Sequence, residues 1–258
     1  RGVVPPSHGR ARLCAMHDAT GRGETPAGTV LDDPQGLAAA VARIREFPGP
    51  VEITIGGDHP VGPHMGSLVR RQTALRLREA GAEPLLLRAP VAVDDDIPDE
   101  GVLAAVDDAL ELCRGVGAGW LVLALGGVAH RGRQRRRLYS MLAALAEAAS
   151  HRQVKLMVQN STIVEEVGML MALLDREYDN GALDVTAPDV TSMAWDVSRS
   201  RAAGQADNAA WEYVRRAAAR APVLVRGITV EDAETLSRGL PGFEENRAAG
   251  RVLLVLTR

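Results

Sequence analysis

Eight short apolar runs alternate with longer stretches of helical periodicity along the chain, and this alternation most constrains the fold. The runs are apolar on both faces, as parallel strands covered by helices must be. Roughly 30 to 40 residues separate successive starts, which is room for one helix and two loops in a barrel. The runs are RLCAM (12–16), VEITI (51–55), LLLR (85–88), WLVLAL (120–125), VKLMV (154–158), ALDV (182–185), VLVR (223–226) and RVLLVL (251–256).

The segments between the runs repeat apolar residues every three or four positions, which is typical of helices with one buried face. Three such faces are clear: Leu37, Val41 and Ile44; Val102, Val106, Leu110 and Cys113; and Leu138, Met141, Leu142 and Leu145. Gly115 or Gly117 is a plausible end for the second helix. We predict one domain, residues 1–258, folded as a (β/α)₈ barrel, with an open doubly wound sheet as the second choice.

The last run is followed only by Thr257 and Arg258. We therefore expect the barrel to lack its usual last helix. The N-terminal segment or a partner subunit would then cover the outer face of that strand, so a homo-oligomer is possible.

Composition excludes several classes of protein. The net charge of −3 gives no basic excess for nucleic acid, and no apolar run is long enough to span a membrane. The opening RGVVPPSHGR lacks the apolar region of a signal peptide, and two isolated cysteines, Cys14 and Cys113, suggest a reduced, cytoplasmic protein. Lys155 is the only lysine among 30 basic residues, a bias typical of a high-GC bacterium. The basic run HRGRQRRR (130–137) is either a solvated loop and first helical turn or a binding site for a phosphate or carboxylate group.

The order and spacing of the third to sixth runs resemble those of the xylose-isomerase-like TIM barrels. The resemblance lies in ALRLREAGAEPLLLRAP, AVDDALELCRGVGAGWLVLALGG, VKLMVQN and GALDVTA, and it covers roughly residues 35 to 258. That superfamily includes sugar-phosphate isomerases and epimerases, inosose and dehydroshikimate dehydratases and endonuclease IV.

The resemblance implies a divalent metal at the C-terminal mouth of the barrel, held by a Glu, an Asp, a His and a Glu from the fifth to eighth strands. Carried over, these positions fall on Gln159, Asp184, Arg226 and Thr257. Only Asp184 keeps its type, while a neutral amide, a guanidinium and a hydroxyl are poor or impossible ligands. We therefore expect no metal and no other cofactor.

Further polar residues follow the predicted strands, where barrel active sites are built. His17 is a candidate for proton transfer or a plain loop histidine. His59 lies in GGDHP, which also resembles the GGDHS of arginase-like ureohydrolases, although the companion DAH.D motif is missing. A tight turn capped by Asp58 explains GGDHP without a ligand. The remaining candidates for substrate binding are Arg88, His130, Gln159 and Asn160.

Two hypotheses follow. The first is a metal-independent isomerase or epimerase, or a related lyase or cyclase, acting by proton transfer on a small polyoxygenated carbonyl substrate. Arg226 would replace the metal, and Asp184 would orient it or act as a base. The second is a catalytically inactive barrel that serves as a binding or assembly module. The expected partner is a small molecule rather than nucleic acid or a membrane.

Overall fold

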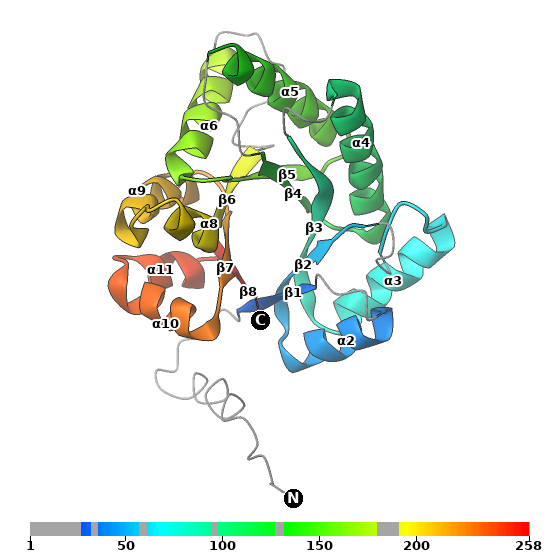
Figure 1. Ribbon diagram of the computed structural model, residues 1–258. Coiled ribbons are helices and arrows are strands. Elements are labelled where there is room, and N and C mark those ends of the chain that lie inside the picture. The colour runs from blue at the N-terminus through cyan, green and yellow to red at the C-terminus, as the bar shows by residue number, and fades with distance from the viewer. Residues whose placement is uncertain are drawn as a thin grey trace, which may run out of the picture.

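Eight parallel strands close into a barrel in the order of the sequence, with helices around the outside (Figure 1). The structure, a computed structural model, describes residues 27–31, 36–56, 61–93, 98–126, 132–179 and 191–257. The strands are β1 (Gly28–Leu31), β2 (Gly49–Thr54), β3 (Ala82–Val93), β4 (Trp120–Leu125), β5 (Lys155–Gln159), β6 (Thr191–Asp196), β7 (Val223–Ile228) and β8 (Val252–Leu256). The predicted (β/α)₈ fold is confirmed.

The helices of the described residues form the outer ring. They are α2 (Leu37–Glu46), α3 (Ser67–Glu79), α4 (Asp99–Val116), α5 (Gly132–His151), α6 (Val164–Asp179), α8 (Val197–Ala202), α9 (Asp207–Ala218), α10 (Val230–Gly239) and α11 (Phe243–Ala248). The apolar face predicted for α4 is buried, and its C-cap Gly117 has the left-handed conformation, with φ 71°. None of these helices combines the length and the apolar character needed to cross a bilayer.

The first and sixth strands of the barrel differ from the predicted ones. The first and sixth places belong to β1 and β6, not to 12–16 and 182–185, which lie outside the described residues. Arg88 and Arg226 do not end their strands, because β3 continues to Val93 and β7 to Ile228. The outward residues Val252 and Leu254 of β8 are buried in the core between sheet and helices, and α11 packs against this strand.

Strand alternation sorts the side chains of the sheet into two apolar clusters. One set of residues packs outward against the helices. The other fills the barrel interior and consists of Val30, Leu86, Val122, Met157, Ala194, Leu224, Leu253 and Val255. In the register of the sheet, Glu52 of β2 lies between Val30 of β1 and Leu86 of β3. A carboxylate therefore takes a place that neighbouring strands fill with apolar side chains.

Candidate functional site: a buried arginine network

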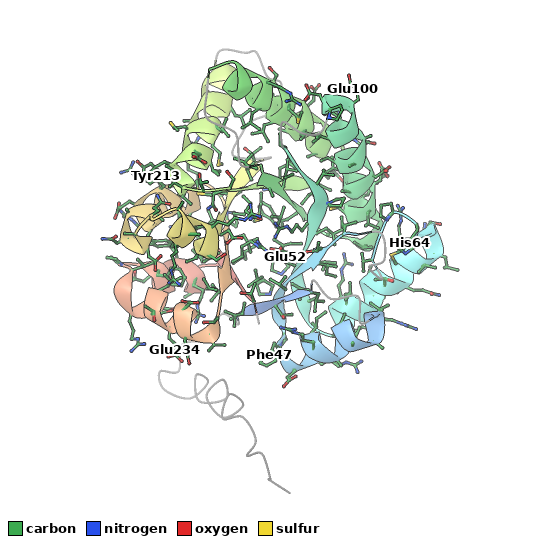
Figure 2. All side chains as sticks on the ribbon, in the orientation of Figure 1. Phe47, Glu52, His64, Glu100, Tyr213 and Glu234 are labelled. Atoms are coloured by element: carbon green, nitrogen blue, oxygen red, sulfur yellow. The ribbon has the colours of Figure 1, made fainter. Side chains whose placement is uncertain are left out.

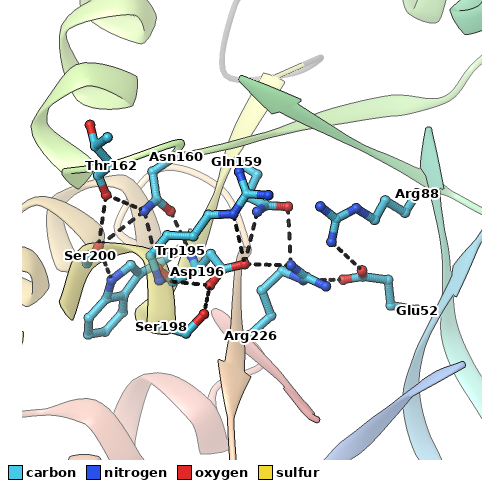
Figure 3. A network of polar contacts seen from close by, with 11 residues as sticks. Glu52, Arg88, Gln159, Asn160, Thr162, Trp195, Asp196, Ser198, Ser200 and Arg226 are labelled. Atoms are coloured by element: carbon cyan, nitrogen blue, oxygen red, sulfur yellow. Dashed lines mark hydrogen bonds and ion pairs between the residues drawn. The ribbon is translucent and has the colours of Figure 1, made fainter. Parts of the chain in front are cut away.

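A network of polar side chains lies inside the barrel, toward the C-terminal ends of the strands (Figure 3). Arg88, Gln159, Asp196 and Arg226 each come two residues after an interior apolar residue of the same strand. Because side chains of a strand alternate between its two faces, all four belong to the inner face. The mouth of the barrel is thus lined with polar groups above an apolar core.

Arg226 is the centre of this network. Its Nε donates to Glu52 Oε2 at 3.0 Å, and its Nη1 donates to Asp196 Oδ2 at 2.6 Å and to Gln159 Oε1 at 3.3 Å. The side chains of Arg226 and Asp196 are each 5% exposed, and that of Glu52 is fully buried. Buried charges are tolerated when they are paired and hydrogen-bonded, and here one guanidinium joins two carboxylates from opposite sides.

Asp196 is held on both of its carboxylate oxygens. Oδ2 accepts from Gln159 Nε2 at 3.0 Å in addition to Arg226. Oδ1 accepts from the hydroxyl of Ser198 at 2.7 Å and from the backbone N–H of Arg199 at 3.2 Å. Asp196 is the N-cap of α8, so the turn from strand to helix fixes its direction. Its position is set by the backbone as well as by Arg226.

Asn160 ties the ends of β5 and β6 together. Its Oδ1 accepts from the backbone N–H of Asp196 at 2.7 Å, and its Nδ2 donates to the carbonyl oxygens of Thr162 and Asp196 at 2.8 and 3.2 Å. Ser200, which accepts from Asn160 Nδ2 and from Trp195 Nε1, completes the cluster. Asn160 is one of the residues predicted to bind substrate, and its amide also positions the backbone that carries Asp196.

Two more arginines flank the centre. Arg88 Nη1 lies 3.7 Å from Glu52 Oε1, and Arg199 Nε lies 3.7 Å from Asp196 Oδ2. Their side chains are 17% and 39% exposed, so both lie nearer to solvent than Arg226 does. Each carboxylate of the network therefore lies between the central arginine and a more exposed one. Figure 3 shows this chain of alternating charges from Arg88 through Glu52 and Arg226 to Asp196.

The structure brings together three of the predicted residues, Arg88, Gln159 and Arg226, and Asn160 lies beside them. Asp184 is not the residue that ends β6, so Asp196 takes the place that the sequence interpretation gave to Asp184. Asp184, together with the histidines His17, His59 and His130, lies outside the described residues.

Sequence reasoning missed Glu52 and Asp196. The signal for Glu52 was present, because a single acid in the apolar run VEITI needs a partner if the strand is buried. Figure 2 shows Glu52 on the inner side of the sheet, whereas Glu100, Tyr213 and Glu234 lie on the outer helices. For Asp196 the signal was weaker, because it required the sixth strand to be placed correctly.

The metal implied by the family resemblance does not fit these residues. Both carboxylates, Glu52 and Asp196, bind Arg226, whose guanidinium cannot donate a lone pair and repels a cation. The hydroxyl of Thr257, after β8, donates to the carbonyl oxygen of Ile228 at 3.0 Å. Within the described residues, no group of three or more His, Cys, Asp or Glu side chains is arranged to hold a metal ion.

Comparisons with known proteins find similar proteins through structure alone. No family model matches the chain, and no curated protein matches it by sequence. A xylose isomerase domain protein from Planctomyces limnophilus superposes with a TM-score of 0.61 at 11% identity, over 91% of each chain. The 3-keto-D-glucoside 4-epimerase of E. coli gives 0.60 at 13% identity, over 89% of this chain and 90% of the epimerase.

Endonuclease IV from Thermus thermophilus is also similar, with a TM-score of 0.58 at 17% identity, over 90% of this chain and 92% of the nuclease. At such identities the likeness concerns the fold, and it extends over nearly the whole barrel. This likeness of fold agrees with the resemblance inferred from the order and spacing of the predicted strands. The chain has the barrel fold of the xylose-isomerase-like proteins, shared with sugar epimerases and endonuclease IV.

Proposed function

We propose that this barrel is a metal-independent isomerase or epimerase, or a related lyase or cyclase, acting on a small polyoxygenated carbonyl substrate. The proposal rests on one observation: Arg226 is a buried cation near the C-terminal ends of the strands, and its position is fixed by Glu52, Asp196 and Gln159. Barrel enzymes bind their substrates at this end. The xylose isomerase domain protein and the epimerase among the similar structures make this reaction class the natural one to test.

The reaction that suits a fixed cation is proton transfer next to a carbonyl group. A base removes the proton, the C–H electrons form a carbon–carbon double bond, and the carbonyl electron pair moves onto oxygen. The enediolate oxygen then carries negative charge, which a preorganised guanidinium stabilises without reorganisation. Return of the proton to the former carbonyl carbon, with the proton of the neighbouring hydroxyl moving to the enediolate oxygen, gives an isomer. Return of the proton to the other face of the same carbon, with the carbonyl group restored, gives an epimer.

The proposal assigns roles to the residues of the network. Arg226 faces the developing oxyanion, and Glu52 and Asp196 are positioning residues that hold its planar fork in one orientation. Asp196 is not the base of this proposal, because both of its oxygens already accept hydrogen bonds. His17 remains our candidate for the proton carrier. The candidates for contacts with substrate oxygens remain Arg88, Gln159, Asn160, His59 and His130.

The engagement of Asp196 also favours a second candidate function. A carboxylate with four donors around it suits a network that stabilises the fold, as expected of a barrel that only binds or assembles. In that case the partner would still be a small molecule at the mouth, and we propose neither nucleic acid nor a membrane surface as a partner.

Exchange with deuterated water distinguishes the two functions. The purified protein is incubated with EDTA and a panel of aldoses, ketoses and their phosphates in D₂O, and NMR detects deuterium at the carbon next to the carbonyl. We expect exchange with at least one compound, and a loss of about 100-fold or more in Arg226→Lys, because an ammonium cannot replace the fork. No exchange with any compound would favour the binding module.

The control is Arg201→Lys. Arg201 also joins two carboxylates, Asp207 and Asp232, but on the surface and away from the barrel interior. This variant should exchange deuterium like the wild type. Equal exchange in Arg226→Lys and Arg201→Lys would remove Arg226 from the site, and exchange that needs added manganese or zinc would contradict the metal-independent mechanism.

A further inference from the structure

Helix α3 presents an apolar surface to solvent. Three of the five large, well-exposed apolar side chains in the described part of the chain belong to it: Leu68 is 67% exposed, Val69 49% and Leu75 58%. Leu68 and Leu75 are seven residues apart, so both lie on one face of the helix. The buried face of α3 is formed by Thr73, Ala74 and Leu77, so these leucines are not needed to attach α3 to the barrel.

The same helix is strongly basic. It carries four arginines and one glutamate. Arg70 and Arg78 donate to backbone carbonyl oxygens of Met65 and Gly117. Arg71 and Arg76, which flank Leu75 along the helix, form no ion pair within the described residues. An exposed stripe of leucines with unpaired arginines beside it is suited to bind a surface that combines small apolar residues with acidic ones.

The neighbouring helix α4 has that chemistry. It carries five acidic residues and one arginine. Asp99 pairs with Arg137, and Asp107 pairs with Arg152. Glu100 and Asp108 form no ion pair with any residue that the structure describes.

The exposed side of α4 also carries small residues, Gly101 and Ala104, between these two acids. Figure 2 shows Glu100 at the outer surface of the molecule. This side of α4 is therefore acidic and open to close approach by another helix.

We infer that two copies of this chain associate through these helices, with α3 of each copy packed on α4 of the other across a twofold axis. Leu68 and Leu75 lie against the small residues of the partner's α4, and Arg71 and Arg76 face its acidic residues. The surface is self-complementary because the basic and the acidic helix are adjacent in one chain (Figure 1). Arg78 Nη2, 3.3 Å from the carbonyl oxygen of Gly117 after α4, confirms this adjacency.

Size supports the use of both helices. A helix of 13 residues is about 20 Å long and about 10 Å wide, so α3 alone covers a fraction of the roughly 800 Å² that each partner of a stable interface buries. In the twofold arrangement each copy contributes both α3 and α4, and the 18 residues of α4 add a helix about 27 Å long, which more than doubles the area that α3 offers alone. The association is independent of the function proposed for the barrel mouth, because neither helix contributes to the arginine network.

Sedimentation velocity on the full chain tests the inference. We expect a concentration-dependent dimer, and Leu68→Glu or Leu75→Glu should raise its dissociation constant about 30-fold or more, as for a central interface residue. Met169→Glu is the matched control, since Met169 is 46% exposed but lies on α6, and it should leave the dimer unchanged. A chain that stays monomeric, or a dimer that survives both leucine changes, would overturn the inference.

Charge reversal tests which helices meet. Arg71→Glu with Arg76→Glu should weaken the dimer, as should Glu100→Arg with Asp108→Arg. A chain with all four changes should dimerise again, because its α3 is then acidic and its α4 basic. Failure of the four-fold variant to dimerise, with a melting temperature equal to that of the wild type, would show that α3 does not meet α4.

Discussion

Arg226→Met measures how much the buried network depends on one cation. The change removes the charge but keeps an unbranched side chain of similar length. Glu52, which is fully buried, and Asp196, with a side chain 5% exposed, then lose their shared partner. Removing one member of a buried ion pair typically costs about 3 to 5 kcal/mol, because an uncompensated charge is left out of water.

Urea denaturation followed by circular dichroism gives the free energy of unfolding. With a slope of about 2 to 3 kcal/mol per molar urea, the predicted loss lowers the midpoint by about 1 to 2.5 M. Arg201→Met is the control, because its partners Asp207 and Asp232 are on the surface, where an ion pair contributes about 1 kcal/mol or less. A loss in Arg226→Met no larger than in the control would refute the reasoning.

A second substitution tests the cause. Glu52→Gln in the Arg226→Met background replaces the carboxylate that has lost Arg226 with a neutral amide of the same shape. If unpaired charge is the source of the instability, the double variant should be more stable than Arg226→Met by about 1 kcal/mol or more. A double variant that is less stable than Arg226→Met would show that lost packing, not charge, explains the effect.

Three further predictions concern other parts of the described chain. Gly227→Ala should destabilise the protein and disturb the network, because φ is 71° there and a Cβ would lie 2.4 Å from Asp196 Oδ1; urea denaturation and the deuterium exchange assay check it. Burial raises the pKa of the Cys113 thiol, so iodoacetamide at mildly alkaline pH should modify Cys113 only after denaturation, as mass spectrometry would show. A hydrogen bond from the backbone N–H of Thr229 lowers the pKa of Asp232. The ionised carboxylate therefore stabilises the fold at pH values above its unfolded-state pKa of about 4, and this contribution is lost as the pH falls through its folded-state pKa. Asp232→Asn should lower the free energy of unfolding at neutral pH and change it little in acid, as urea denaturation at the two pH values would show.

The sequence determined the class of fold because the pattern that carries it is local. The apolar run WLVLAL at 120–125 and the helical face of Val102, Val106 and Cys113 are each complete within one element. A strand with two covered faces must be apolar throughout, and a helix with one covered face must repeat its apolar residues. Six of the eight strands could be recognised in this way.

The first and sixth strands could not be placed by the same pattern. β1 is the four-residue segment GTVL, and β6, TSMAWD, mixes polar and apolar residues because its inner face carries Ser192, Ala194 and Asp196. The more apolar segments at 12–16 and 182–185 matched the expected spacing better. A short strand contributes too few residues for periodicity to decide between such alternatives.

The site was decided by tertiary structure. The sequence interpretation paired Arg226 with Asp184 of the predicted sixth strand; in the structure Asp196 of β6 binds Arg226, and Asp184 lies outside the described residues. Glu52, 174 positions away from Arg226 in sequence, could be paired with it only by closure of the barrel. Local pattern reports which face of an element is buried, but the partner of a buried charge depends on which faces the closed sheet brings together, and that is a property of the whole chain.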